Sequence, residues 1–515
     1  MQANGLQLAR RSLDHTRDHA SLLRKLWRYR DAWLDLDIQS CFKQDCGDED
    51  MTLWGLRDGV FAKAYPQNAS AVSGPKAAMA FFPLDEAGEN RTQINLDVTF
   101  NEFTTDLGQD LVVLAGVDPD RKSRGWLRLR SSTTGRAHPQ AEHPLSTIEL
   151  GFSVDTGISS TPVTLGIKNE LVAAMFASPG QRVYEILIWN WKTGELLHRI
   201  SCNTGICSFG FLDDDRLVVW SASSSNVENG LAVVSLLVYE QIGSGTGLGR
   251  DASHCEPLNV TSFPILKPSF TFQFPKLQTP SFVGPRGFLL QSDYGSGSGI
   301  SASAPFVNLR ALTLGLTMNI SLYRRSSHFR IFIDTHRLLK HRERAREKAV
   351  SKLSWDEWGE HSTRWFFEER SGHQTCLMFG SRALFTDEHL SIVDFHTPTV
   401  HRSSNCCKNT YVSLERSMDC LEARKKQIRV GQLPSIIDRH SMESSWLDEL
   451  DGVAVDKNAV VVDSIASQEP TIVAVPGLVE PVTSRLPYRV VTQVRPAHAH
   501  GGWLISGNQL VGVKM

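Results

Sequence analysis

The stretch of residues 170–200, ELVAAMFASPGQRVYEILIWNWKTGELLHRI, constrains the fold more than any other part of the chain. It divides into three predicted strands and two turns. Residues 183–191 alternate with a period of two and carry bulky side chains on both sides, which predicts a strand covered on both faces. Gly180 and Gly194 mark the reversals, and the second can supply the positive φ of a hairpin loop. A meander of this kind cannot bury its faces alone, so we expect copies of it.

A weak internal repeat provides such copies. The segment DLVVLAG at 110–116 matches ELVAAMF at 170–176, and each precedes a polar break, a tryptophan-containing strand and a Thr-Gly pair. The offset is 60 residues from Leu111 to Leu171 and 59 from Gly135 to Gly194, and RLVVWSA at 216–222 begins the pattern again. Units of about 40–60 residues with four strands each are typical of β-propeller blades, whereas a β-sandwich would not repeat over this length.

Short apolar or alternating runs fill the chain from residue 53 onward, and Gly, Pro, Asn, Asp and Ser divide them. We therefore predict an all-β fold, an irregular β-propeller of about seven blades over residues 51–515, whose last strand closes the ring against the first blade. The strands expected before residue 241 are 60–64, 79–82, 94–100, 111–115, 126–130, 148–154, 171–176, 183–191, 196–200, 217–221 and 231–240. Later ones include an edge strand at 270–274, then 329–333, 375–379 and runs beginning at 459, 471, 484 and 509.

Residues 1–50 form a separate N-terminal helical segment. An apolar stripe over 16–36 includes Leu22, Leu26, Tyr29 and Trp33 at spacings of three or four, which predicts a helix. Its two tryptophans favour docking on the propeller over a free partner-binding helix. Within the propeller we expect glycine-rich loop insertions near 241–262 and 294–303 and a helical insertion near 334–353.

The helical insertion is basic in its middle. A solvated helix anchored to a blade by its apolar side chains explains it most simply, and an acidic partner or an RNA backbone are the alternatives. The missing aromatic interleaving disfavours RNA. The acidic residues of this insertion are Glu343 and Glu347. Its positive or potentially positive residues are His336, Arg337, Lys340, His341, Arg342, Arg344, Arg346 and Lys348.

Net charge and the termini limit the partners and the compartment. The formal charge is -2 with a pI near 6.8, so no global field attracts nucleic acid or an anionic membrane. The first residues lack the apolar core of a secretory signal, and no long uncharged apolar window predicts a membrane span. Nine cysteines, an odd and small number for this length, suit a reducing compartment. We expect an intracellular protein, cytoplasmic or nuclear.

No cluster of reactive residues in the sequence supports an active site. Cys202, Cys207 and nearby His198 could bind zinc, but structural zinc sites use tighter cysteine pairs, so we expect core residues instead. Cys406-Cys407 with Cys420 and His401, and His498 with His500, are equally weak metal candidates. The glycine run beginning at Gly243 lacks the spacing and the strand–helix context of a phosphate loop. We therefore predict no catalytic residue, no cofactor and no metal.

Four segments resemble fungal F-box proteins whose C-terminal part is an irregular WD-repeat-like propeller. WRYRDAW at 27–33 is similar to the helix that joins the F-box region to the propeller. IWNWKTGELL at 188–197 resembles a degenerate WD blade ending, with Asn190 in place of the WD aspartate. WDEWGEHSTRWF at 355–366 and IVDFHTPTVHR at 392–402 resemble later blades, and SRLPYRVV at 484–491 resembles the closing strand. The resemblance covers roughly residues 22–492, while the F-box itself is not recognisable.

The resemblance implies a non-catalytic protein-interaction scaffold, similar to the substrate-recognition part of an F-box ubiquitin-ligase receptor. A protein target would be bound by the propeller, and a Skp-type adaptor and a cullin would be partners if an F-box were present or supplied. The alternative is a propeller enzyme, a hydrolase with its site in the central channel. That alternative needs His, Asp and Glu side chains to converge at the ring axis, whereas the sequence scatters them. We therefore expect no enzyme.

Overall fold

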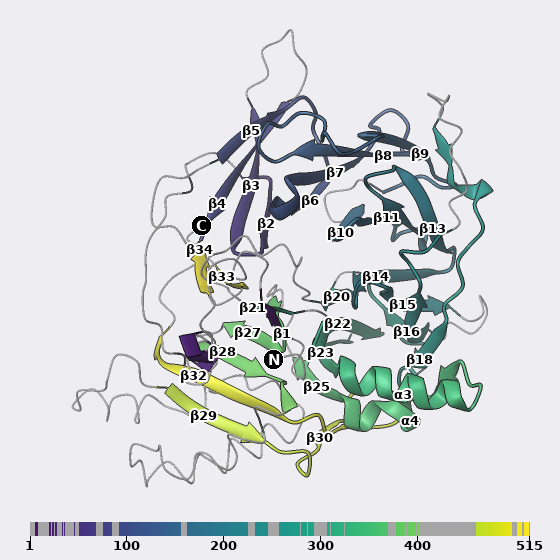
Figure 1. Ribbon diagram of the computed structural model, residues 1–515. Helices are drawn as coiled ribbons and strands as arrows, with labels where there is room; N and C mark the ends of the chain where they lie inside the picture. Colours follow the sequence, from purple (N-terminus) through teal and green to yellow (C-terminus); the bar gives the residue numbers. More distant parts are fainter. Residues whose placement is uncertain are drawn as a thin grey trace.

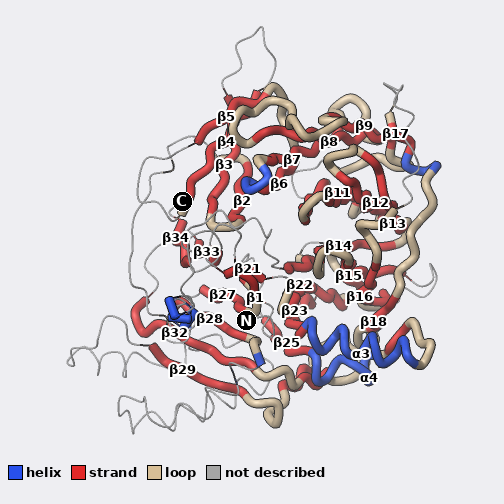
Figure 2. The backbone as a smooth tube through the Cα atoms, viewed as in Figure 1, coloured by secondary structure: helices blue, strands red, loops and turns tan. Residues whose placement is uncertain are grey.

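The computed structural model is a ring of β-sheets arranged around a central axis (Figures 1 and 2). It describes residues 6–8, 51–67, 76–84, 92–155, 162–224, 232–245, 257–278, 280–285, 287–292, 306–308, 311–323, 325–368, 377–386, 389–397, 400, 460–496, 502–506 and 509–513, with a few residues between 20 and 46. Within these ranges six sheets of four or five strands form the blades. The predicted all-β propeller is therefore confirmed.

Blades 1 to 3 each run as a four-stranded antiparallel meander from the ring centre outward. Blade 1 contains β2 (Leu53–Arg57), β3 (Val60–Gln67), β4 (Lys76–Pro83) and β5 (Thr92–Leu96). Blade 2 contains β6 (Glu102–Asp106), β7 (Leu111–Val117), β8 (Arg124–Ser131) and β9 (Leu145–Glu149). Blade 3 contains β10 (Val163–Lys168), β11 (Leu171–Ser178), β12 (Val183–Asn190) and β13 (Glu195–Cys202).

Blades 4 to 6 are less regular because segments are inserted between their strands. Blade 4 contains β14 (Gly205–Phe211), β15 (Arg216–Ser224), β16 (Ala232–Glu240) and β18 (Phe270–Gln273). In blade 5, β19 (Phe282–Val283) and β20 (Leu289–Ser292) both pair with β22 (Thr313–Leu322), which precedes β23 (Arg325–Asp334) and β25 (Thr363–Glu368). In blade 6 the strands lie side by side in the order β26 (Leu377–Phe379), β27 (Arg382–Thr386), β28 (His389–Asp394), β32 (Tyr488–Pro496) and β29 (Val460–Ile465).

The predicted count of about seven blades is wrong, because the described residues form six. Two apolar runs that suggested blade strands are hairpin strands instead. The run at 471 forms β30 (Thr471–Val473), which pairs with β31 (Val482–Ser484), and the last run forms β34 (Gln509–Val513), which pairs with β33 (Gly502–Ser506). Trp355 and Trp358, expected at strand positions, lie in helix α4 (Trp355–Ser362), which begins with a capping box of Ser354 and Glu357.

The 60-residue repeat corresponds to the second strands of successive blades. DLVVLAG, ELVAAMF and RLVVWSA form β7, β11 and β15, and every residue of β7 and β11 is buried. Gly135 and Gly194 occupy equivalent turns with φ of 70° and 71°, as positive φ at a reversal requires. Strand β12 is buried along its six central residues, which confirms the prediction of cover on both faces.

A short segment of the predicted loop 241–262 straps the outer edges of three blades. Its described part forms β17 (Leu258–Asn259), parallel to β9 of blade 2, and a 3-10 turn at Val260–Ser262. Ile265 then bridges to Arg199 on β13 of blade 3, again in parallel, before the chain enters blade 4 as β18. We call residues 258–266 the strap. The predicted edge strand, β18, is itself partly covered by β24 (Lys352–Leu353).

The hairpin β33–β34 fills the gap between blades 6 and 1 (Figure 1). Ile505 packs with blade 6 residues and with Trp33 of the N-terminal segment, whereas Leu504 packs with Phe61 and Phe82 of blade 1. Closure therefore uses side-chain packing, because within the described residues the two strands of the hairpin pair only with each other. The described residues between 20 and 33 are helical, and buried Trp33 docks on blade 6, although Trp27 is 53% exposed.

Two helices pack beside blades 4 and 5. The predicted helical insertion is present as α3 (Thr335–Glu347), which Asp334 caps by accepting a hydrogen bond from the Arg337 backbone. Leu338 and Leu339 of α3 and Trp358 of α4 belong to the large apolar cluster between these blades. The insertion is therefore anchored as expected, and most of its charged side chains are exposed, while Arg342 is buried.

Shortening Leu504 tests the closing hairpin. We expect Leu504→Ala to lower the free energy of unfolding by about 2–4 kcal/mol, because a buried leucine side chain is lost from the blade 1 contact. Ile472→Ala on β30, where the side chain is 46% exposed, is the control and should change it by about 0.5 kcal/mol or less. Denaturant unfolding of both variants measures the difference; equal midpoints would contradict closure by this contact.

Candidate functional site

The turns between the first and second strands of blades 1 to 4 lie at one end of the ring and form a continuous polar surface. They comprise residues 58–59, 107–110, 169–170 and 212–215, and we call this surface the rim. Asp58, Asp110 and Asn169 have φ between 50° and 55°, a region that Asn and Asp tolerate better than other side chains. Function in propellers and other rigid scaffolds concentrates on such connections.

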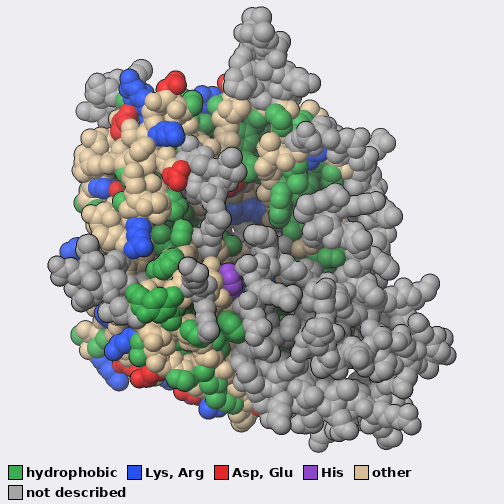
Figure 3. Space-filling view, turned by 180° about the vertical axis from the view of Figure 1, so that it is seen from behind, with side chains coloured by type: hydrophobic (Ala, Val, Ile, Leu, Met, Phe, Trp, Pro, Cys, Tyr) green, Lys and Arg blue, Asp and Glu red, His purple; other side chains and the backbone are tan. Residues whose placement is uncertain are grey.

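Arg57 joins the first three blades beneath the rim. It is the last residue of β2, and its guanidinium donates to Thr104 Oγ1 of β6 (3.4 Å) and to the Ile167 carbonyl of β10 (2.8 Å). It also forms an ion pair with Asp58 at 3.5 Å. Basic side chains are visible in the depression near the middle of the opposite view (Figure 3). One arginine thus crosslinks three inner strands through charge-assisted hydrogen bonds.

The same network continues from blade 2 to blade 4. Gln109 Nε2 donates to the Asn169 carbonyl (2.8 Å), and Asn169 Nδ2 donates to Asp214 Oδ1 (3.0 Å). Buried Lys168 lies 3.3 Å from the same Asp214 oxygen. Because the turns of blades 2, 3 and 4 are hydrogen-bonded to one another and Arg57 ties blade 1 to strands β6 and β10, the rim is fixed in shape before any partner arrives.

Each turn is also fixed within its own blade. Asp110 accepts hydrogen bonds from the hydroxyls of Ser131 and Ser132 and from both the backbone and hydroxyl of Thr133. Burial alone would raise the pKa of Asp110, but these donors outweigh it and lower the pKa. In blade 3, Asn190 accepts from the Lys192 and Thr193 backbones, the role a carboxylate would have at the WD position.

Glu102, the first residue of inner strand β6, is the most perturbed carboxylate near the channel. Burial raises the pKa of its side chain to about 7, against the opposing effect of a hydrogen bond from the Phe103 backbone (2.9 Å). A carboxyl with a pKa near 7 can exchange protons at neutral pH, which is the property of a general acid or base.

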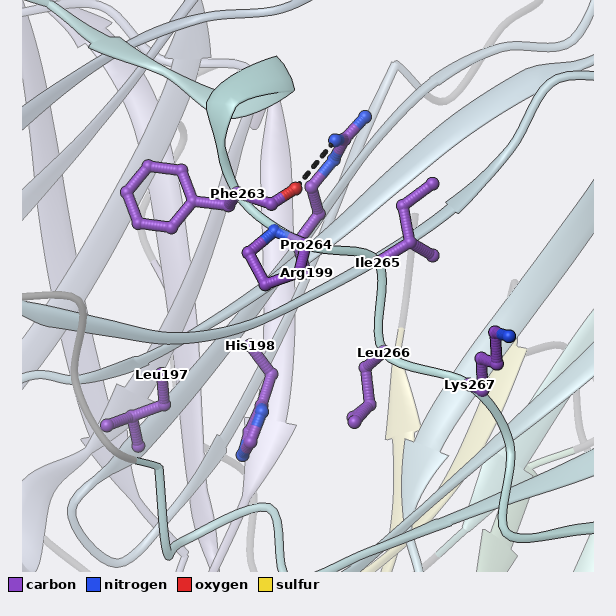
Figure 4. Close-up of a pocket in the computed structure, with 8 residues that line it drawn as sticks. All are labelled: Leu197, His198, Arg199, Phe263, Pro264, Ile265, Leu266 and Lys267. Carbon is purple, nitrogen blue, oxygen red and sulfur yellow. Dashed lines mark hydrogen bonds between the residues drawn. The ribbon is translucent and has the colours of Figure 1, made fainter.

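A pocket of about 180 Å³ lies where the strap crosses β13 (Figure 4). Leu197 and His198 flank one side, and Ile265 to Lys267 form the other. Small-molecule sites usually measure about 300–1,000 Å³, so this pocket suits a single side chain of a protein better than a substrate. Burial lowers the pKa of His198, whose Nε2 contacts the Gln241 carbonyl at 3.3 Å, so its ring is neutral at pH 7.

A buried ion pair holds the strap against blade 3. Arg199 donates to both carboxylate oxygens of Glu185 (2.9 and 2.8 Å) and to the strap carbonyl of Phe263 (3.0 Å). Ser201 donates to the same carboxylate. Hydrogen bonding to Glu185 raises the pKa of Arg199, so the guanidinium stays charged and is already fully engaged. It positions the strap and is not available to a ligand.

Cys202 and Cys207 pack against the same apolar cluster between blades 3 and 4, but His198 does not join them as a third metal ligand. Cys202 and Cys207 are free thiols, Cys207 Sγ contacts Met175 Sδ, and His198 turns to Gln241. In the described part of the chain no group of three His, Cys, Asp or Glu side chains could hold a metal ion. The histidines and cysteines at 401–420 and at 498–500, and the glycine runs from 246 to 256 and from 294 to 303, lie outside the described residues.

The buried tryptophans of the ring fill the gaps between blades. Trp189 is buried in β12, and the fully buried set comprises Trp191, Trp220, Trp358 and Trp365. Trp191 also donates its indole N–H to the Asn169 carbonyl of the rim (3.0 Å). Trp54 on inner strand β2 is 43% exposed and stacks on Phe61, so it is a candidate hot-spot tryptophan for a partner.

Sequence inspection missed the residues that build the rim and the strap. Arg57, Glu102 and Asp214 come from strands or turns without a motif, and the inner strands of blades 1 to 4, β2, β6, β10 and β14, were not predicted. The internal repeat could have located the rim turns, because residues 109–110 and 169–170 occupy the same position before the matching segments. No pattern in the sequence indicates that Glu185 on β12 lies against Arg199 on the neighbouring strand β13.

Comparisons with known proteins give no family. No family model and no curated protein matches the chain. Similar solved structures include an uncharacterized protein from Listeria monocytogenes EGD-e, with 9% identity over 68% of this chain and 82% of that one and a TM-score of 0.31. The β-propeller domain of the trilobed protease from Pyrococcus furiosus gives 8% identity, coverage of 67% and 88%, and a TM-score of 0.26. Such low values carry no inference about function.

Among the residues that the structure describes, none forms a helix that is both long and apolar enough to span a membrane.

Replacing Glu102 tests its raised pKa. The folded protein binds the Glu102 proton more tightly than the unfolded chain, whose value is near 4.5, so the wild type loses stability as pH rises from about 4.5 to 7. Glu102→Gln removes that loss, and its stability relative to wild type should increase by roughly 1–3 kcal/mol across this window. Unfolding measured at pH 4.5 and 7.5 gives the difference; a pH-independent difference would contradict the assignment.

Breaking the Glu185–Arg199 pair tests the strap contact. We expect Glu185→Gln to destabilise the protein by about 3 kcal/mol, because the buried guanidinium loses its counter-charge. The double variant Glu185→Leu with Arg199→Met should recover most of that loss, since no unpaired charge is left. Denaturant unfolding of Glu185→Leu, Arg199→Met and the double variant completes the cycle. Additive losses would show that the two side chains do not act as a pair.

Proposed function

We propose that this protein is a non-catalytic protein-interaction scaffold whose rim holds a protein target. Two sets of hydrogen bonds carry the proposal. Gln109, Asn169 and Asp214 link the turns of blades 2, 3 and 4, and Arg57 ties blade 1 to the inner strands of blades 2 and 3, so the rim is a preformed polar surface. A preorganised surface loses little conformational entropy on binding. Exposed charges on it, such as Glu170 and Asp214 at 51% and 66%, can select a partner.

The resemblance to fungal F-box proteins refines this proposal. In such a protein the propeller would recognise the target of a ubiquitin ligase, and a Skp-type adaptor would bind elsewhere. Docking of Trp33 on blade 6 supports it, because this residue belongs to the segment that resembles the F-box-to-propeller helix. The proposal therefore places target binding on the ring and assigns no adaptor-binding residue.

Affinity purification with rim variants tests the proposal. The tagged chain is expressed in a fungal host, and proteins retained by wild type are compared with those retained by Glu170→Lys with Asp214→Lys. Asp97→Lys, which changes an equally exposed carboxylate outside the rim, is the control. We expect the target to be lost, by about tenfold or more in recovered amount, from the rim variant and kept by the control.

Three outcomes of that purification can be told apart. Recovery of the Skp-type adaptor and a cullin together with a rim-dependent target supports the ligase-receptor function. Rim-dependent proteins without the adaptor support a plain scaffold. If nothing retained by the wild type depends on the rim, the proposal fails.

The alternative function is a hydrolase with its site in the central channel. One observation favours it, since Glu102 on inner strand β6 has a pKa of about 7, which suits a general base. Purified wild type and Glu102→Gln would be compared on ester and peptide substrates. Hydrolysis by wild type that Glu102→Gln abolishes would favour the enzyme over the scaffold.

A further inference from the structure

Helix α3 presents a row of basic side chains on one side. Arg337, Lys340, His341 and Arg344 fall within an arc of about 100° at 3.6 residues per turn, and both glutamates of the helix lie outside that arc. His361, at the end of α4, adjoins them, because Arg337 Nη1 donates to its carbonyl at 2.6 Å. We call these five residues the basic ridge.

The five groups are close enough to repel one another. Burial lowers the pKa of His341, and the charges of Arg344, His361, Arg337 and Lys340 lower it further. The acidic neighbour of the ridge is Asp334, which pairs with Arg337 at 3.7 Å. Lys340 and Arg344 are exposed and form no ion pair with a described residue. The ridge therefore keeps an uncompensated positive charge at neutral pH.

Helix stability does not explain this arrangement. Positive side chains are favourable in the last turn, where they face the negative end of the helix dipole, and Arg344 and Arg346 fit that role. Arg337 lies in the first turn, where positive charge is unfavourable, and the first turn contains no acidic residue. In contrast, Arg342 of the same helix is buried and paired with Glu240. The ridge cations are thus separate from those that hold the helix to the ring.

We propose that the basic ridge binds an acidic, Asp- and Glu-rich segment of a protein partner. The ridge is about 10 Å long from Arg337 to Arg344, and an extended segment places side chains on one side about every 7 Å, so two or three carboxylates reach it. Arginine can bind such carboxylates in a bidentate manner. The overall charge of -2 gives no general attraction, so recognition is local to this surface.

A nucleic-acid strand fits this surface less well than an acidic peptide. Single strands are bound by grooves that combine positive charge with exposed aromatic rings for base stacking. The nearby Trp355 and Trp358 pack against each other and against Phe274, so they offer no exposed stacking platform. The experiment must therefore be able to detect binding to an RNA backbone as well as binding to an acidic peptide.

Fluorescence anisotropy with a short labelled poly-glutamate peptide tests the proposal on the full chain. We expect the peptide to bind at low salt, to bind progressively less as salt is added, and to lose at least about tenfold in affinity with Lys340→Glu and Arg344→Glu together. Arg346→Glu with Lys352→Glu is the matched control, because it removes two exposed cations outside the ridge and changes the net charge equally. The control should bind nearly as well as wild type.

Three results would overturn the proposal. These are no binding of the peptide at low salt, equal losses in the two double variants, and tighter binding of a single-stranded RNA of equal length. Lys340→Gln with Arg344→Gln, a milder change, guards against a folding defect, and circular dichroism checks every variant. This inference rests on the proposed scaffold function but uses a different surface, so loss of peptide binding leaves target capture by the rim, which Glu170→Lys and Asp214→Lys test, unaffected.

Discussion

The burial of both faces of every blade is the constraint on which the structure depends. Strands such as β7 and β11 have no polar face to turn toward water, so an isolated sheet of this sequence would expose a large apolar area on each side. A ring solves the problem, because every blade covers its two neighbours. The apolar clusters accordingly lie between blades, as between blades 2 and 3 and between blades 4 and 5. The gap between blades 6 and 1 needs the hairpin β33–β34 for the same reason.

Polar groups within the ring follow a second rule, that buried charge needs a partner. Arg199 has Glu185, and the rim links Lys168 to Asp214. Arg364, which is fully buried in β25, reaches two backbone carbonyls and Thr471, although burial lowers its pKa to about 10. These contacts cross between elements far apart in sequence, so each positions one blade or strap relative to another. The exposed cations of the basic ridge lie outside this rule, and Lys340 and Arg344 form no ion pair with a described residue.

Local pattern predicted the elements whose own residues carry the signal. The alternation in β12, the matched segments of β7 and β11 and the amphipathic α3 all gave correct elements. The pattern failed where neighbours decide the outcome. Inner strands such as β6 (EFTTD) are short and polar and become strands only because β7 pairs with them. The segment WDEWGEHS became a helix because Ser354 and Glu357 cap it, even though its tryptophans suggested a blade. The rim depends on contacts between blades, which no single segment encodes.

The strap has a consequence for how the ring opens. In an ordinary meander each blade contacts only its two neighbours and can loosen by itself. Here residues 258–266 run along β9 and β13 before the chain completes blade 4 with β18. Blade 4 therefore cannot detach its outer strand without disturbing the edges of blades 2 and 3. Amide hydrogens of these three blades should exchange as one cooperative unit, slower than those of blade 1, so the strap sets the boundaries of local unfolding.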